Sequence, residues 1–344
     1  MVEDYLLQMF NVEYRRPNVI FSIITGRNTV SNIYWGMRYD LLDYFSIDPQ
    51  FTNEIYQKIL SKLKQNKLLT ESNGQVRLTQ NGLIRQKKAK SDLYQIKHPK
   101  LINQYKFNEW SETCILAIQV VSELSFVNRH YYPVVTSELT KFNIKKWISN
   151  NDKTILTKQV NLELRLFVQE IDTNSSLIFM NKLIGHNLNG LTNKQLANEL
   201  NLSEMEIQLI YRDTINFFAS WIEEQKQSVF KELVQSILKT GIISESAKET
   251  MRLITMGLSV SDVAKSRGLK TSTIFEHLLE LAMISEKFPF DTFLTKKIIN
   301  DLSEIMGRDI DQVPFKIIQN KKPDINFFDY RLYQIYRSKI DVQN

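Results

Sequence analysis

The sequence predicts a mainly α-helical, multi-domain protein with a winged-helix-like N-terminal part and helix-turn-helix units. Apolar residues recur at helical spacing along most of the chain, whereas the alternating pattern of a strand is almost confined to residues 75–79. At roughly 150 residues per domain, the 344 residues allow two or three domains. Hydrophobic residues make up 43% of the chain, which is enough to form packed cores and excludes a disordered chain.

Helical spacing of apolar residues predicts the main helices. We expect one over 55–69, a buried one over 114–124 and a long one over 207–222. A further stripe is formed by Leu162, Leu166, Phe167 and Ile171. The turn signal Ser72-Asn73-Gly74 separates the first helix from the short strand at 75–79, and a helix followed by a short hairpin resembles the end of a winged helix.

Composition shifts and prolines divide the chain into four predicted segments. These are a winged-helix-like N-terminal domain at 1–100, a helical linker or middle region at 101–185, a helix-turn-helix unit at 186–230 and a second helix-turn-helix domain at 231–344. Whether 101–185 is a separate spacer or forms one domain with the segment after it is left open by the sequence.

Several classes of protein are disfavoured by simple counts. Cys114 is the single cysteine, so no internal disulfide can form, and we expect a buried thiol in a reducing compartment. The acidic start, Met1 to Asp4, lacks the pattern of a signal peptide, and no apolar run is long enough to span a bilayer. We therefore expect a cytoplasmic protein with no membrane partner, with association with the nucleoid left open.

Motifs of common enzymes are absent from the sequence. It contains no phosphate-binding P-loop, no H-E-x-x-H, no C-x-x-C and no G-x-S-x-G. The four histidines are scattered, and with one cysteine they do not form a ligand set for zinc. We expect a protein that is not an enzyme and that needs no cofactor and no metal.

Positive charge is concentrated in the first hundred residues, which hold 15 basic and 9 acidic residues. Their net charge of +6 equals the net charge of the whole chain. A basic run can bind phosphate, and Arg77 on the wing strand would lie beside a duplex backbone. A solvated helix face is the alternative interpretation, and winged helices also dock proteins. The candidate DNA-binding residues of this run are Arg77, Arg85, Lys87, Lys88 and Lys90.

A helix pair is predicted between Gly190 and Ile222. Thr192 and Gln195 have the spacing of a capping box, and so have Ser203 and Glu206 after the turn at Asn201. Glu204 and Glu206 would occupy the first turn of the second helix, which is the end that normally approaches base edges, and carboxylates there would repel phosphate. This pair is therefore interpreted as a packing or partner-binding element.

The strongest helix-turn-helix pattern covers residues 255–278. Ser259 is expected to cap the first helix, Gly268 to form the turn and Thr271 to cap the second helix, whose buried stripe would be Ile274, Leu278 and Leu281. Basic residues surround the turn, and polar ones project from the start of the second helix, where they could bind phosphates or base edges. The candidate DNA-binding residues are Lys265, Arg267, Lys270, Thr271, Ser272, Thr273 and Glu276. A pair used only for packing is the alternative.

This pattern resembles a known module. Residues 259–269 (SVSDVAKSRGL), 271–278 (TSTIFEHL) and the tail 325–332 (INFFDYRL) are similar to the helicase-associated helix-turn-helix domain of bacterial RecQ-type DNA helicases. Residues 26–35 resemble, more loosely, the opening of stand-alone proteins that carry this domain and are typically encoded beside such a helicase. The resemblance implies a RecQ-type helicase and duplex or forked DNA as partners, in repair or recombination, without a motor in this chain.

Two other functions remain open at this point. A helix-turn-helix transcription regulator would prefer one operator sequence and usually act as a symmetric dimer. A pure protein–protein adaptor is favoured slightly by Phe275, which lies where a reading helix is often polar. The sequence also leaves self-association open.

Overall fold

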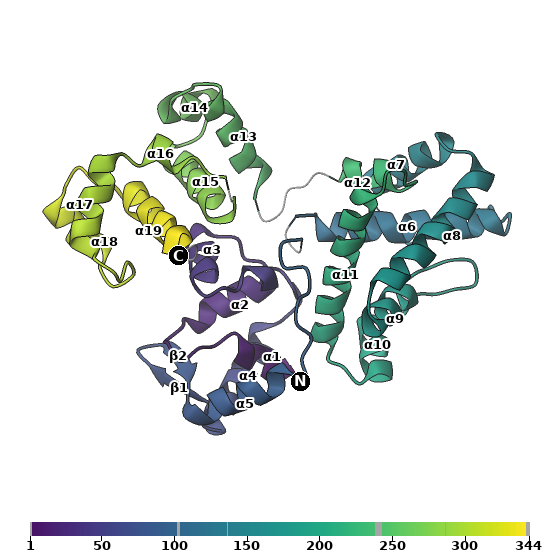
Figure 1. Ribbon diagram of the computed structural model, residues 1–344, viewed down its shortest axis with the longest axis horizontal. Helices are drawn as coiled ribbons and strands as arrows, with labels where there is room; N and C mark the ends of the chain where they lie inside the picture. The colour runs from purple at the N-terminus through teal and green to yellow at the C-terminus, as the bar shows by residue number, and fades with distance from the viewer. Residues whose placement is uncertain (1, 102–103, 136, 238–242, 286, 342–344) are drawn as a thin grey trace. The chain divides into compact units, whose positions relative to one another are not determined.

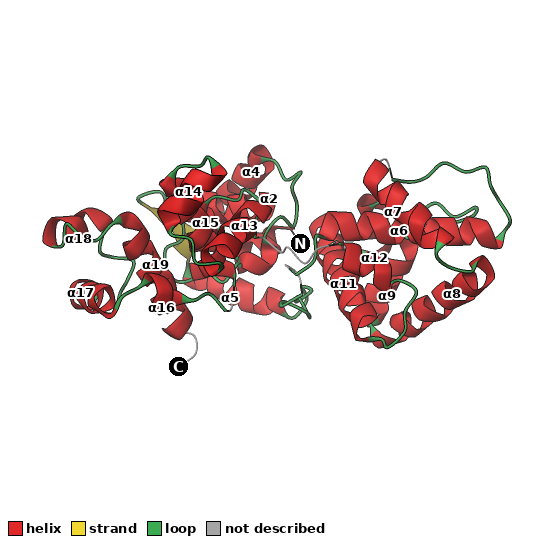
Figure 2. Cartoon of the chain, turned by 90° about the horizontal axis from the view of Figure 1, so that it is seen from above, coloured by secondary structure: helices red, strands yellow, loops and turns green. Residues whose placement is uncertain are grey.

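The computed structural model describes every residue except 1, 102–103, 136, 238–242, 286 and 342–344. The chain forms two compact units (Figure 1). Unit 1 consists of Met1–Gly26 and Asp43–Gly241, and unit 2 of Arg27–Leu42 and Ile242–Asn344. Helices dominate both units, as Figure 2 shows by colour, which confirms the predicted fold class. The four predicted segments stay a prediction, because these units are defined by contacts and not by sequence order.

The N-terminal part of unit 1 has the helix and hairpin order of a winged helix. Its elements are α1 (Val2–Gln8), α2 (Pro17–Thr25), α4 (Asn53–Gln65), β1 (Leu69–Ser72), β2 (Gln75–Leu78) and α5 (Gln80–Lys90). A short 3-10 helix (Leu42–Tyr44) spans the residues where the chain returns from unit 2 to unit 1. Asn73 and Gly74 both have positive φ, at 51° and 72°, which is typical of a two-residue hairpin turn with Asn-Gly. Arg15 pairs with Val76 through two backbone hydrogen bonds of 2.8 Å, so a third extended segment borders the hairpin.

The predicted helix over 55–69 is wrong at its C-terminal end. The helix α4 ends at Gln65, Lys67 has a φ of 54°, and the chain then enters β1, where Leu69 lies opposite Leu78. Both leucines are buried, so pairing across the hairpin outweighs the local helical pattern. Gly82 of α5 is required here, because a Cβ atom on it would lie 2.0 Å from the carbonyl oxygen of Leu68.

Seven helices complete unit 1 as a bundle: α6 (Phe107–Ser125), α7 (Glu138–Ser149), α8 (Lys153–Glu170), α9 (Thr173–Asn181), α10 (Asn193–Leu200), α11 (Glu204–Glu224) and α12 (Lys231–Ser236). The predicted helices at 114–124 and 207–222 are confirmed within α6 and α11, and Cys114 is buried. Trp110 and Trp147 fill the core and donate indole hydrogen bonds to the carbonyls of Ile215 and Val229.

The predicted apolar stripe on α8 is largely wrong. Leu162 and Leu166 are exposed, whereas the buried side of α8 carries Leu156, Val160, Glu163 and Phe167. Glu163 occupies a core position because its carboxylate accepts hydrogen bonds from the Ser228 hydroxyl and the Val229 amide, at 2.5 and 2.9 Å. Burial raises the pKa of this carboxyl. The hydrophobic pattern therefore did not predict the buried side of α8, because a charged residue occupies one of its core positions.

The N-terminal part and the helical bundle of unit 1 are joined by a segment that binds to Asp213 of α11. Its carboxylate accepts hydrogen bonds from the Tyr94 hydroxyl at 2.6 Å, from the Lys97 amide at 2.6 Å and from the His98 amide at 3.1 Å. Asp213 is 1% exposed. A buried carboxylate with several donors is well satisfied, so this segment is held firmly on α11.

Unit 2 is built around α15 (Thr271–Ile284). The other elements are α3 (Val30–Arg38), α13 (Glu245–Thr255), α14 (Val260–Arg267), α16 (Phe290–Phe293), α17 (Lys296–Met306), α18 (Phe315–Lys321) and α19 (Phe327–Asp341). The helices α3, α13, α14 and α19 all pack on α15 (Figure 1). The N-terminal segment that contains α3 is held here by Asp311, which accepts from the Tyr34 hydroxyl at 2.5 Å and from Arg38 at 2.8 Å.

Candidate nucleic-acid interface

The helices α14 and α15 form the predicted helix-turn-helix. The Ser259 hydroxyl caps α14 by accepting from the Asp262 amide, and Gly268 ends α14 in the left-handed conformation, with a φ of 63°. Val263 and Ala264 of α14 are buried against α15, whose Ile274, Leu278 and Leu281 are buried as predicted. The turn therefore has the local geometry that the sequence indicates.

The start of α15 differs from the prediction in one respect. Lys270 and not Thr271 is the N-cap residue, and no side chain caps the helix, so Thr271 is the first helical residue. The amides of Thr273 and Ile274 bond to the Lys270 carbonyl, at 3.0 and 3.2 Å. Thr271 and Ser272 are exposed, and Thr273 is half-buried. The first turn of α15 thus presents the Thr271 and Ser272 side chains to solvent, and no side chain caps its backbone N–H groups.

The three basic residues around the turn have different surroundings. Lys265 and Lys270 are exposed, and neither takes part in an ion pair with any residue that the structure describes. Arg267 is half-buried and faces α13, where its guanidinium donates to the Ser246 carbonyl at 2.7 Å, to the Ser246 hydroxyl at 2.8 Å and to the Thr250 hydroxyl. Arg267 therefore joins α14 to α13.

His277 extends this network to α15. Its Nδ1 atom lies 2.9 Å from the hydroxyl of Thr250, the residue that Arg267 also contacts. Burial and the nearby Arg267 guanidinium lower the pKa of His277 below its usual value. The network connects α13, the end of α14 and α15, so it positions the turn that carries Lys265 and Lys270. Glu276, on the same helix, is exposed.

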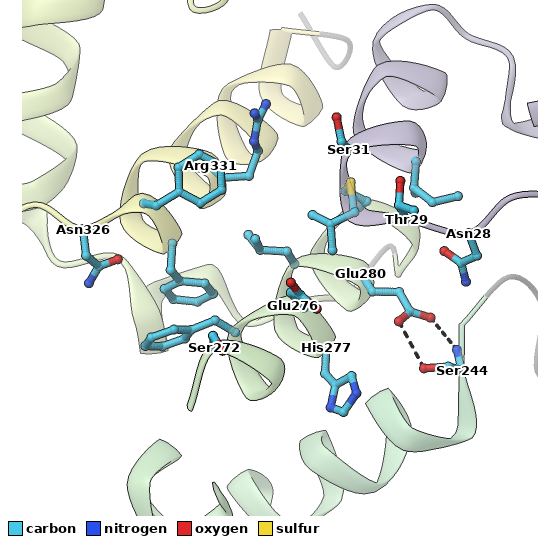
Figure 3. A pocket seen from close by; sticks show the side chains of 17 residues that line it. Asn28, Thr29, Ser31, Ser244, Ser272, Glu276, His277, Glu280, Asn326 and Arg331 are labelled. Atoms are coloured by element: carbon cyan, nitrogen blue, oxygen red, sulfur yellow. Dashed lines mark hydrogen bonds between the residues drawn. The ribbon is translucent and has the colours of Figure 1, made fainter. Parts of the chain in front are cut away.

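A pocket of about 890 Å³ lies beside the start of α15, between α3, α15 and α19 (Figure 3). Phe275 lines it and stacks on Phe328 of α19, with ring centroids 4.5 Å apart, so packing within unit 2 accounts for this aromatic residue on a reading helix. Glu280 closes one end by accepting hydrogen bonds from the amide and hydroxyl of Ser244.

Sequence reasoning missed Arg331, which also lines this pocket. Its guanidinium lies 3.9 Å from the centroid of the Tyr34 ring, a cation–π contact between α19 and α3. The two residues lie in the two stretches that carry the resemblance, 26–35 and 325–332, which are about 300 positions apart in the chain. That shared resemblance was the one signal that pointed to both stretches.

The basic residues of the N-terminal run belong to unit 1, whereas those of α14 and α15 belong to unit 2. Arg77 is exposed on β2, with its guanidinium 4.7 Å from the centroid of the Tyr14 ring. Arg85 of α5 forms two hydrogen bonds with the Asp4 carboxylate, at 2.8 and 3.3 Å. Lys87, Lys88 and Lys90 are exposed in the last turn of α5, where positive charge complements the helix dipole.

The second predicted helix pair is α10 and α11. Thr192 and Gln195 form the predicted capping box, and Asn201 ends α10 with a φ of 53°. Ser203 caps α11, but the reciprocal half of its predicted box is wrong, because the Glu206 carboxylate instead accepts from the Tyr94 amide at 3.2 Å and the Tyr5 hydroxyl at 3.4 Å. The start of α11 is thus buried in unit 1.

Two properties of the described residues bear on other functions. No helix among them is long and apolar enough to cross a membrane. No group of three or more histidine, cysteine, aspartate or glutamate side chains in the same part of the chain could hold a metal ion.

Comparisons with known proteins agree with this geometry. A family model described as a helix-turn-helix domain matches residues 246–334, which run from α13 into α19. Among curated proteins, Protein YpbB of Bacillus subtilis (strain 168) is 24% identical over 200 residues, or 58% of this chain. The matched stretch spans 56% of that protein's own length. No solved structure matches the chain significantly. The chain carries a helix-turn-helix domain and has a distant relative in this bacterial protein.

Proposed function

We propose that this protein is a non-enzymatic accessory factor of a RecQ-type DNA helicase. The accessory factor binds DNA through its own α14 and α15 and acts in repair or recombination. The observation that carries the proposal is the exposed first turn of α15, flanked by Lys265 and Lys270, within a segment that matches a helix-turn-helix domain. Helices of this kind enter the major groove with their N-terminal residues.

In this proposal the exposed residues of the turn have distinct roles. Lys265 and Lys270 neutralise phosphates, and the Thr271 and Ser272 hydroxyls, with the uncapped N–H groups of the first turn, bind a phosphate or a base edge. Arg267 acts through its contacts with α13 and so positions the turn. Glu276 lies one turn further along α15 and would accept a hydrogen bond from a cytosine amino group.

The helicase part of the proposal is supported by the resemblance of residues 259–278 and 325–332 to the helicase-associated domain. Because the chain has no phosphate-binding P-loop, ATP-driven unwinding would come from the partner. A stand-alone copy of the domain would supply to the helicase, as a separate chain, the DNA contacts that fused copies supply within one chain.

Fluorescence anisotropy with duplex and forked DNA tests DNA binding. Replacing Lys265 and Lys270 by Glu should weaken binding about tenfold or more and reduce the slope of log K against log salt by about 2. Lys296→Glu with Lys297→Glu is the matched control, because it makes the same charge change at two exposed positions of unit 2. Equal affinities of the unmodified protein and the Lys265/Lys270 variant would contradict DNA binding by this turn.

Co-purification with the RecQ-type helicase of the same organism tests the partner. We expect the full chain to retain the helicase, and DNA binding to favour forks with little sequence preference. A strong preference for one operator sequence, without helicase binding, would indicate a transcription regulator. Helicase binding that survives in a protein without measurable DNA affinity would indicate a protein–protein adaptor.

A further inference from the structure

We propose that a groove in unit 1, between the end of α6 and the start of α8, binds the backbone of single-stranded DNA. This α6–α8 groove has a volume of about 390 Å³. It is lined by Leu124 and Ser125, by Val127–Arg129 in the turn after α6, and by Lys153, Thr154, Thr157 and Lys158 of α8. The site lies outside the helix-turn-helix domain, so the proposal does not depend on duplex binding by α15.

The charge of the groove favours a polyanion. Arg129, Lys153 and Lys158 line it and are exposed, and no acidic residue belongs to the lining. None of these three side chains forms an ion pair with a residue in the described part of the chain. The stretch 126–158 around them holds six Lys and Arg residues against two acidic ones. Three unneutralised cations at one concave site would release counterions on binding phosphates.

The two acidic residues of that stretch are engaged elsewhere. Asp152 caps α8 by accepting from the Ile155 amide at 2.9 Å, and Glu138 pairs with Lys141 at 2.9 Å. The Thr154 hydroxyl lines the groove beside Lys153 and can donate to a phosphate oxygen. The groove therefore offers donors and positive charge without a competing carboxylate in its lining.

The turn that carries Arg129 is held in an unusual conformation. Val127 has a φ of 55°, a region that β-branched residues rarely adopt and that costs conformational energy. The buried Glu123 carboxylate holds the next residue by accepting from the Asn128 side-chain amide at 2.6 Å, and it also contacts His186 at 2.9 Å. Phe126 stacks on His186, with ring centroids 4.4 Å apart. These contacts keep Arg129 at the groove.

Exposed aromatic rings accompany the positive charge. Phe126 directly follows α6 and is 62% exposed, and Tyr132, six residues further along the same loop, is 95% exposed. The loop after α6 turns back along that helix (Figure 2), where the Gln119 side chain bonds to the Tyr132 carbonyl at 3.0 Å and to the Val134 amide at 2.9 Å. Gln119 lies six residues before Ser125, which lines the groove. The loop therefore holds Tyr132 about 9 Å along α6 from the groove, a distance that one bound strand can span.

This combination fits a single strand better than a duplex. Bases of a single strand are free to stack on an aromatic ring while their phosphates follow a basic groove, and one such site covers several nucleotides. In a duplex the base faces are already stacked on one another and are not available to Tyr132. An acidic protein would match the charge but gives no reason for a tyrosine that is almost fully exposed.

Anisotropy with a labelled oligothymidylate of about 20 nucleotides tests the proposal on the full chain. Replacing Arg129, Lys153 and Lys158 by Glu should weaken binding about tenfold or more and reduce the salt slope by about 2. Tyr132→Ala should weaken binding of the oligonucleotide about tenfold. Tyr132→Phe should bind it as tightly as the unmodified protein, because the ring alone stacks on a base. The matched control replaces Lys58, Lys194 and Lys226, which are exposed in unit 1, by Glu.

The outcomes separate this proposal from the function proposed above. We expect the groove variant to keep its duplex affinity and the Lys265/Lys270 variant to keep its oligothymidylate affinity. Unchanged oligothymidylate binding by the groove variant would overturn the proposal. A second result would also overturn it: polyglutamate displaces the oligonucleotide, and Tyr132→Ala binds the oligonucleotide as tightly as the unmodified protein. The groove would then bind acidic polypeptides through charge alone.

Discussion

The two helix pairs of this protein, α10–α11 and α14–α15, share a local design and differ in their surroundings. Each first helix has a hydroxyl cap and ends with a residue in the left-handed conformation, Asn201 or Gly268. In the first turn of α11, Met205 and Glu206 are buried and Glu204 is exposed, whereas the first two residues of α15, Thr271 and Ser272, are both exposed. The motif therefore provides a turn, and the neighbouring elements decide whether the start of its second helix is accessible.

Removing the Glu206 carboxylate should have the largest effect on stability. Glu206→Ala leaves the Tyr94 amide without its acceptor at 3.2 Å, and we expect the free energy of unfolding to fall by about 2 kcal/mol. Chemical denaturation measures this change. Glu204→Ala is the control, because Glu204 is exposed in the same turn and should change stability by less than about 0.5 kcal/mol. Equal effects would mean that the start of α11 is not buried.

Arg267 should hold α14 on α13 in unit 2. We expect Arg267→Ala to destabilise the contact between α13 and α14 by about 1–2 kcal/mol, because three hydrogen bonds to Ser246 and Thr250 are lost. Faster hydrogen exchange of the α13 amides would report this loss. Lys265→Ala should leave that exchange unchanged, since Lys265 is exposed. If the two variants exchange alike, Arg267 does not position the turn.

The left-handed residues of the two turns should respond in opposite directions. Gly268→Ala should cost about 1 kcal/mol, because a Cβ at a φ of 63° is strained even though no atom lies within 4 Å of it. Asn201→Gly should be neutral or slightly stabilising at a φ of 53°. Thermal unfolding of both variants measures the difference. A loss of stability in Asn201→Gly would show that the asparagine side chain has a further role.

The smallest effect should come from the titration of His277. Because its pKa is lowered in the folded protein, the unfolded chain takes up the proton first as the pH falls below about 6.5. The stability of unit 2 should therefore be highest above that pH and decrease below it. Hydrogen exchange of α13 and α15 between about pH 7.5 and about pH 5.5 follows the change. In His277→Gln the pH dependence in this range should be reduced, and an unchanged dependence would assign it to other groups.

Much of the local structure followed from the sequence, whereas the candidate sites did so only in part. The pattern located the turn at Gly268 and the exposed Lys265 and Lys270, because caps and left-handed turns depend on residues three to five positions apart. The same pattern missed the engagement of Arg267 by α13. It did not reveal the α6–α8 groove, whose lining comes from the ends of two separate helices.

The sequence by itself determined the helical class, the Asn73-Gly74 hairpin and the two helix-turn-helix pairs, because these depend on hydrophobic period and on local hydrogen bonds. Only the tertiary structure decided that α3 belongs with the C-terminal helices, that Leu69 pairs in a strand and that Leu162 and Leu166 face solvent. These outcomes depend on contacts between segments far apart in the chain, such as Tyr34 with Asp311 and Glu163 with Ser228, whose free energies exceed local preferences.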